Sequence, residues 1–133
     1  MGRMTYAAFC IIGILSFSCK KEKIETDPQK AILGKWEIVE MGNWPNMDPI
    51  EDPLGYEEYL PDSVLRQFDY KTNTSIYKKY WIEDSTLLIS TLREDGLELV
   101  FEYKYDFFDK NNRLRLDAYS LMIFNTSIYK RLK

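Results

Sequence analysis

The chain has 133 residues, with 18 basic and 21 acidic side chains, no histidine and two cysteines. This length allows one domain, and the net charge of −3 gives no electrostatic basis for binding nucleic acid. The lack of histidine removes the commonest general base and metal ligand, and two cysteines are too few for a disulfide scaffold or a cysteine-based zinc site. We therefore expect no metal and no cofactor.

The first segment has the pattern of a secretory signal. Arg3 is followed by an uncharged run, residues 4–18, which is shorter than the roughly 20 apolar residues of a membrane-spanning helix. Leu15–Cys19 (LSFSC) resembles a bacterial lipobox of the relaxed kind found in lipoproteins of Bacteroidota-type bacteria, in which the cysteine is lipidated. The resemblance implies cleavage after Ser18, an acyl anchor on Cys19 and a place at the outer membrane, on its periplasmic face or at the cell surface. The alternatives are a signal anchor or an ordinary signal cut near Ser18.

The next segment, residues 19–30, is highly charged and has no hydrophobic period. Such a composition predicts a flexible tether between a lipid anchor and a folded domain. From Ala31 onwards the pattern changes, and we expect the folded domain to cover residues 31–133. Residues 31–33 are apolar and allow one short helical turn before the first strand.

The folded domain is predicted to be all-β. In Leu97–Phe107 every odd position is apolar or aromatic, and every even position except Val100 is charged, which predicts a strand with one buried face. Short turns separate this strand from similar segments. The eight expected strands are 35–41, 56–60, 64–70, 75–82, 86–92, 97–107, 113–117 and 122–131.

Eight short strands joined in series favour a closed antiparallel up-and-down barrel, because closure leaves no exposed sheet edge. A two-sheet β-sandwich is the alternative. The width of an eight-stranded barrel is just enough for its own side chains. We therefore expect the inward residues to fill the barrel by default.

The first and last strands carry a further pattern. Gly34-Lys35-Trp36 opens the first strand and Tyr129-Lys130-Arg131 ends the last. Together they resemble the lipocalin (calycin) arrangement, which implies a lipocalin-like barrel closed at one end by Trp36. The resemblance also implies that Arg131 packs over the indole and that Gly34 permits their close approach, both as structural roles.

One long connection, residues 42–55, follows the first strand and contains three prolines and Trp44. Loops carry function more often than cores do, and in lipocalins the corresponding loop covers the mouth of the barrel. Trp44, Tyr56 and Tyr59 are candidate ligand contacts, although they equally fit a loop packed on the barrel rim.

Acidic residues gather in and around this connection. Eight acidic and no basic side chains lie between Lys35 and Arg66, and Glu51 and Asp52 are candidate partner contacts. An anionic docking face, a calcium site and a solvated loop are the three interpretations. The spacing matches no EF-hand loop, so the solvated loop is favoured over a metal site.

No catalytic pattern is present in the sequence. It contains no histidine, no glycine-rich phosphate loop and no nucleophile elbow, and the adjacent Glu57 and Glu58 would face opposite sides of a strand. We therefore expect a non-catalytic, lipid-anchored binding protein for a small or apolar ligand. The alternative is a protein-interaction or inhibitor module with a filled barrel and an acidic docking loop.

Overall fold

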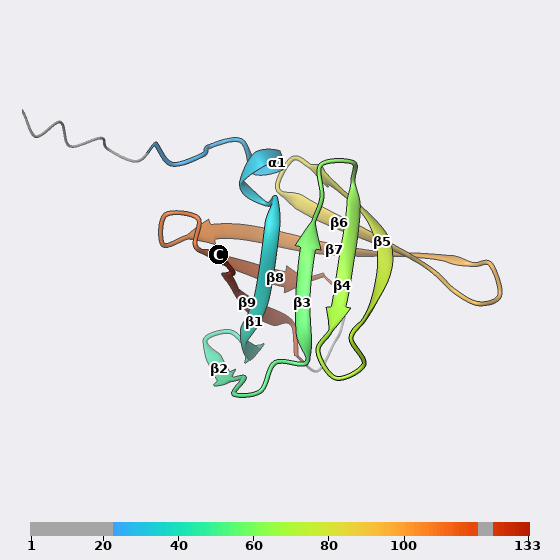
Figure 1. Cartoon of the computed structure of the whole chain (residues 1–133). Coiled ribbons are helices and arrows are strands. Elements are labelled where there is room, and N and C mark those ends of the chain that lie inside the picture. Colours follow the sequence, from blue (N-terminus) through green and yellow to red (C-terminus); the bar gives the residue numbers. More distant parts are fainter. Residues whose placement is uncertain (1–22, 120–123) are drawn as a thin grey trace, which may run out of the picture.

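The computed structural model describes residues 23–119 and 124–133, which form a single β-structure with one short helix (Figure 1). The predicted signal peptide (1–18) and the predicted lipidation site Cys19 lie outside the described residues. The elements are α1 (Pro28–Ala31), β1 (Gly34–Asn43), β2 (Asn46–Pro49), β3 (Gly55–Tyr59), β4 (Val64–Asp69), β5 (Thr74–Glu83), β6 (Thr86–Leu92), β7 (Glu98–Phe108), β8 (Arg113–Ala118) and β9 (Thr126–Arg131).

The strands form a closed antiparallel barrel. Strand β1 pairs with β3, and each strand from β3 to β8 pairs with the next one along the chain. Strand β9 then pairs with β1 and closes the ring. Eight strands thus close on themselves in up-and-down order, which confirms the predicted barrel and rejects the sandwich alternative. Strand β2 is an additional strand outside the closed ring.

Strands β2 and β3 share one edge of β1. The first residues of β1, Gly34–Trp36, pair with β3, whereas its last residues, Glu40–Asn43, pair with β2. The opposite edge of β1 pairs with β9 from Trp36 to Gly42, with a bulge between Ile38 and Glu40. The barrel wall is therefore continuous near the start of β1 and separates between β1 and β3 towards the other end.

Three expectations from the sequence are wrong in detail. The connection 42–55 is not one long loop, because its first part continues β1 and turns at Trp44-Pro45 into β2. The last strand begins at Thr126, whereas it was expected to begin at residue 122, which lies outside the described residues. The helical turn is at Pro28–Ala31, so ordered structure begins within the predicted tether.

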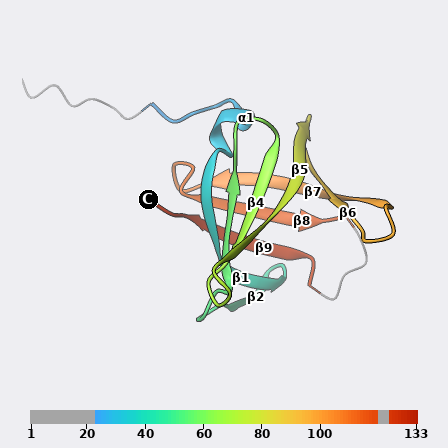
Figure 2. The same cartoon turned by 45° about the vertical axis from the view of Figure 1, so that its right-hand side comes forward.

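Helix α1 covers one end of the barrel, whereas β2 and the β4–β5 turn lie at the opposite end (Figure 2). Helix α1 begins here because the side chain of Asp27 accepts a hydrogen bond from the backbone N–H of Gln29, and because Pro28 occupies the first helical turn. The residue that follows the helix, Ile32, is fully buried in the core. Within the described ranges, no helix is long and apolar enough to cross a membrane.

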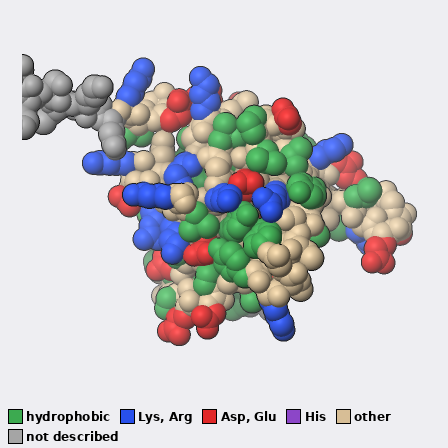
Figure 3. All heavy atoms as spheres, in the orientation of Figure 1, with side chains coloured by type: hydrophobic (Ala, Val, Ile, Leu, Met, Phe, Trp, Pro, Cys, Tyr) green, Lys and Arg blue, Asp and Glu red, His purple; other side chains and the backbone are tan. Residues whose placement is uncertain are grey.

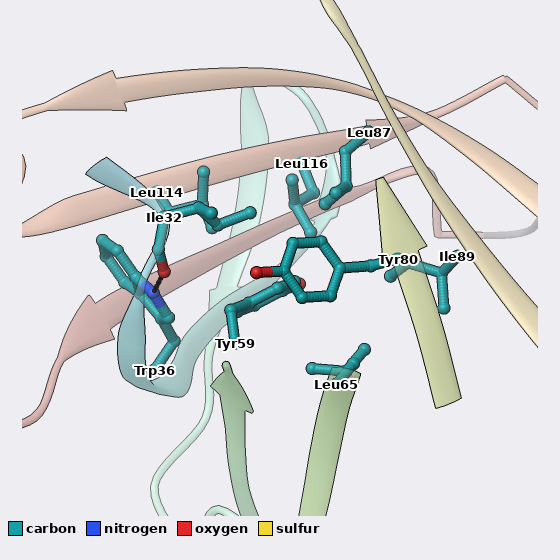
Figure 4. Close-up of a cluster of buried hydrophobic side chains, with 9 residues drawn as sticks. All are labelled: Ile32, Trp36, Tyr59, Leu65, Tyr80, Leu87, Ile89, Leu114 and Leu116. Carbon is teal, nitrogen blue, oxygen red and sulfur yellow. Dashed lines mark hydrogen bonds between the residues drawn. The ribbon is translucent and has the colours of Figure 1, made fainter. Parts of the chain in front are cut away.

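The inward side chains fill the covered end of the barrel. The edge-to-face pair of Tyr59 and Tyr80, with ring centroids 4.9 Å apart, lies at the centre of this core (Figure 4). The predicted inward face of β7 is confirmed for Tyr103, Tyr105 and Phe107, which pack against the buried cluster, whereas Leu97 and Phe101 on the same predicted face are exposed. The fully or nearly buried members of that cluster are Ile32, Trp36, Tyr59, Leu65, Tyr80, Leu87, Ile89, Leu114 and Leu116.

Candidate functional site

The covered end is closed by a cation–aromatic stack. The guanidinium of Arg131 lies 4.2 Å from the ring centroid of Trp36, and the indole Nε1–H donates to the carbonyl of Ile32 at 2.7 Å. Arg131 also donates to the carbonyl oxygens of Ala31, Leu33 and Asn111. The stacking expected of these two residues is thus present, and it ties β1, β9 and α1 together.

The expected close approach at Gly34 is also present. Gly34 has a φ of +113°, and a Cβ atom there would lie 3.1 Å from Nη1 of Arg131. A side chain at this position would meet both an unfavourable backbone conformation and the guanidinium. Gly34 therefore allows the arginine to reach across the end of the barrel.

The opposite end is hollow. A pocket of about 670 Å³ opens to solvent there, which is the size of a small-molecule site. Its apolar lining comes mainly from the inward faces of β1, β5 and β9 and from the segment between β2 and β3. The apolar and aromatic residues that line it include Trp36, Ile38, Met41, Ile50, Leu54, Ile76 and Tyr129.

The mouth exists because β1 and β3 part after three paired residues. Beyond Trp36, β1 no longer pairs with β3, and from Glu40 the same edge pairs with β2. Residues 50–54 connect β2 to β3 where continued pairing of β1 with β3 would have closed the wall. The backbone N–H of Ile50 donates to the carbonyl of Val39, which fixes this crossing at one point. The opening is thus built into the strand register.

A carboxyl group faces the interior of this pocket. Glu57 lies two residues before the buried Tyr59 on β3 and therefore points to the same inward side. The amide Nε2 of Gln67 donates to Oε1 of Glu57 at 3.0 Å, and the Tyr59 hydroxyl donates to Oε2 at 3.3 Å. Burial raises the pKa of Glu57, and these two hydrogen bonds oppose that rise.

Other ionisable groups surround Glu57. Burial and the negative charge of Glu57 raise the pKa of the Tyr59, Tyr103 and Tyr129 hydroxyls, which keeps all three phenols neutral. Lys78 on β5 is the register partner of the buried Leu65 on β4, so its side chain also faces inward. Its positive charge lowers the pKa of Glu57, but by less than the two hydrogen bonds do.

Two further carboxylates line the pocket, Asp52 from the crossing segment and Asp69 at the end of β4. Hydrogen bonds from the backbone of Thr72 and Lys71 lower the pKa of Asp69, so this carboxylate is ionised at neutral pH. Within the described ranges, no group of three or more His, Cys, Asp or Glu side chains is placed to hold a metal ion.

The five candidate contact residues do not form one site. Glu51 and Asp52 are both exposed, and of the two Asp52 lines the pocket. Tyr59 is fully buried in the core, whereas Tyr56 lines the pocket and stacks on Phe68 with ring centroids 5.0 Å apart. The expectation that Tyr59 lines the mouth is wrong, because alternation along β3 turns it towards the barrel axis.

Trp44 does not cover the mouth. It lies in the turn between β1 and β2, 53% exposed, with the guanidinium of Arg115 4.1 Å from its ring centroid. It belongs to a second hollow of about 1080 Å³ on the outer surface, where the β1–β2 hairpin leans over β8 and β9. Residues of both charges, including Asp106 and Lys130, line that hollow.

The acidic run between Lys35 and Arg66 is dispersed by the fold. Glu37 binds Lys130, and Glu58 binds both Arg66 and Lys35, whereas Glu57 points inward. Asp48, Glu51 and Asp52 are exposed on the connection between β1 and β3, so the acidic docking loop considered from the sequence stays a prediction.

The outer face of β3 and β4 is aromatic and basic. Figure 3 shows hydrophobic and basic side chains side by side on the face that β1, β3 and β4 present. Lys35 and Arg66 lie over the ring of Tyr56, which itself packs against Phe68 and Tyr70. The aromatic residues on this face therefore pack against one another and against the two basic side chains.

Comparison of the sequence with models of known protein families and with curated proteins finds no match. The site is therefore described by its own residues. Sequence reasoning missed its polar part, Glu57 and Gln67. Alternation places each of them on the strand face of Tyr59 or Leu65, but only the burial of those two residues in the structure shows that this face is the inward one.

Proposed function

We propose that the protein is a non-catalytic binding protein that takes up a small, largely apolar ligand in the pocket at the open end of the barrel. The observation that carries this proposal is the unequal filling of the barrel. One end is packed by buried side chains and locked by Arg131, whereas the other contains about 670 Å³ of open, largely apolar space.

The architecture supports binding in two ways. A rigid closed end fixes the strands that supply the pocket, so little ordering accompanies ligand entry. Apolar side chains such as Ile38, Met41 and Ile76 line space that water otherwise occupies, and transfer of apolar ligand surface from water into such space is favourable.

The proposal includes attachment to the cell envelope. A lipid on Cys19 would hold the barrel at the outer membrane, because multiple acyl chains give stable anchoring. The charged segment after Cys19 supplies the spacer, and α1 begins at Pro28. The short distance in sequence between the anchor and the closed end favours an orientation with the open end away from the bilayer.

A matched pair of tryptophan substitutions tests the pocket. Ile76 and Tyr77 are adjacent and exposed on β5, but Ile76 lines the pocket and Tyr77 points to the opposite side of the strand. Saturable binding of the neutral fluorescent probe N-phenyl-1-naphthylamine is measured with the full chain in nanodiscs. Probe uptake by the lipid cancels when variants are compared.

We expect Ile76→Trp to weaken probe binding several-fold, because the larger ring occupies the mouth. Tyr77→Trp should bind like the wild type, because its ring adds bulk only outside the barrel. Equal binding by the two variants would contradict the proposal, and so would a wild type that binds neither this neutral probe nor a cationic amine of similar size.

A further inference from the structure

We infer that the ligand is a cation, specifically a protonated amine carried on an apolar body, and that Glu57 receives its charge. This inference rests on the proposed function and names the chemical class that the same pocket selects. It is carried by the sign of the charges around the pocket and by the position of one carboxylate within it.

The ionisable lining of the pocket is acidic. Asp52, Glu57 and Asp69 line it, and no lysine or arginine is among the lining residues from the described part of the chain. Glu57 lies deeper in the barrel, beside the register partner Trp36, whereas Asp69 lies at the β4 end near the mouth. A cation entering the pocket therefore meets carboxylates both at the mouth and deeper inside.

Glu57 retains capacity to accept hydrogen bonds. An ionised carboxylate offers about four acceptor positions, and Gln67 and Tyr59 use one on each oxygen. Both donors are neutral, and none of the salt bridges among the described residues involves Glu57. The ammonium of Lys78 also faces inward but lies outside the pocket lining, and among the described residues it forms no salt bridge with Glu57.

Glu57 is half-buried, and a carboxylate that is partly withdrawn from water without a bound cation carries a desolvation cost. Glutamine at position 57 would keep the acceptor for Gln67 and Tyr59 without that cost, so hydrogen bonding within the barrel does not itself call for a carboxylate. An ammonium group would supply the missing charge and up to three donors. The ring of Tyr129, which lines the same space, can contact a cation.

The same arrangement disfavours the other two ligand classes. An anion would approach three carboxylates. A neutral apolar ligand would remove water from Glu57 and replace it with nothing of opposite charge. An amine on an apolar body would pair its charge with Glu57 and place its apolar part against the apolar lining of the pocket.

Three probes of one shape test the inference. The compounds 2-phenylethylamine, 2-phenylethanol and phenylacetate share a phenyl body and carry a cationic, a neutral and an anionic group at neutral pH. Their binding to the full chain in phosphatidylcholine nanodiscs is measured by calorimetry, with empty nanodiscs subtracted. The variants are Glu57→Gln and, as the matched control, Glu58→Gln, whose side chain faces outward and binds Arg66.

We expect the wild type and Glu58→Gln to prefer the amine to the alcohol by about tenfold or more, the value of a charge-assisted hydrogen bond. Glu57→Gln should lose this preference while its affinity for the alcohol stays within about threefold, which a misfolded variant could not show.

Two results would overturn the inference and separate it from the proposed function. Equal binding of amine and alcohol by the wild type, or an amine preference that survives Glu57→Gln, rejects the cation but leaves a pocket that binds. If none of the three probes binds and N-phenyl-1-naphthylamine also fails, the proposed function fails as well.

Discussion

The closed end of the barrel depends on Trp36, and its truncation to alanine is the sharpest test of that role. The side chain is fully buried, packs at 6.1 Å from the ring centroid of Phe107 and carries the Arg131 stack. A buried tryptophan removes about 200 Å² from water. At about 25 cal/mol per Å², this burial contributes about 5 kcal/mol to the free energy of unfolding. Truncation to alanine removes most of that contribution, so we expect the free energy of unfolding to fall by about 3–5 kcal/mol.

The measurement is urea unfolding of Trp36→Ala followed by circular dichroism, with Trp44→Ala as the control. For a domain of about 100 residues, the expected loss corresponds to a fall in Tm of about 15–25 °C. Trp44 is half exposed on the outer surface, so its truncation should cost less than about 1 kcal/mol.

Trp36→Phe separates ring packing from hydrogen bonding if the alanine variant does not fold. It keeps an aromatic ring but removes the donor to the Ile32 carbonyl, and should cost about 1–3 kcal/mol. A loss below about 1 kcal/mol for Trp36→Ala, or equal losses for the two tryptophans, would refute the closure role.

Two further predictions concern the pocket carboxyl and the anchor. Burial raises the pKa of Glu57 above its ordinary 4.5, so the folded state holds this proton more tightly than the unfolded chain does, and the resulting stability is lost as pH rises through the folded pKa. Glu57→Gln should therefore gain stability relative to wild type as pH rises above the ordinary pKa of 4.5 in denaturant titrations, and a difference independent of pH would contradict the raised pKa of this group. Cys19→Ala should abolish incorporation of labelled fatty acid and release or block processing of the chain, whereas normal cleavage with undiminished membrane retention would reject the lipid anchor.

The barrel could be predicted from sequence because its strands alternate clearly. In β7 every second position from Leu99 to Phe107 is apolar or aromatic, so the sequence shows one apolar strand face clearly. Gly34, Trp36 and Arg131 were found in another way, through the resemblance of the first and last strands to the lipocalin arrangement. The strand alternation is a local pattern, which can be seen directly in the sequence.

The pocket could not be predicted in the same way. In β3 the sequence Tyr56-Glu57-Glu58-Tyr59 places one tyrosine and one glutamate on each face, so alternation alone leaves the inward face undecided. Burial of Tyr59 decides it, and that depends on Tyr80 and Leu65 from other strands.

The β1–β2 hairpin was missed for a related reason. The prolines and Trp44 read as an irregular loop, whereas pairing with β1 after its bulge makes residues 46–49 a strand. This pairing takes β1 away from β3 and opens the pocket. Long-range register, which has no local signature, therefore creates the candidate site.

The central claim concerns the carboxyl group of Glu57, and carbon-13 NMR of glutamate side chains observes that group directly. The Glu57 signal is assigned by its loss in Glu57→Gln, and its pH titration is followed with and without saturating 2-phenylethylamine. The account predicts that the amine lowers the pKa of Glu57 and that 2-phenylethanol does not, because only a cation stabilises the ionised form. An unchanged Glu57 titration in the presence of the amine would contradict the account.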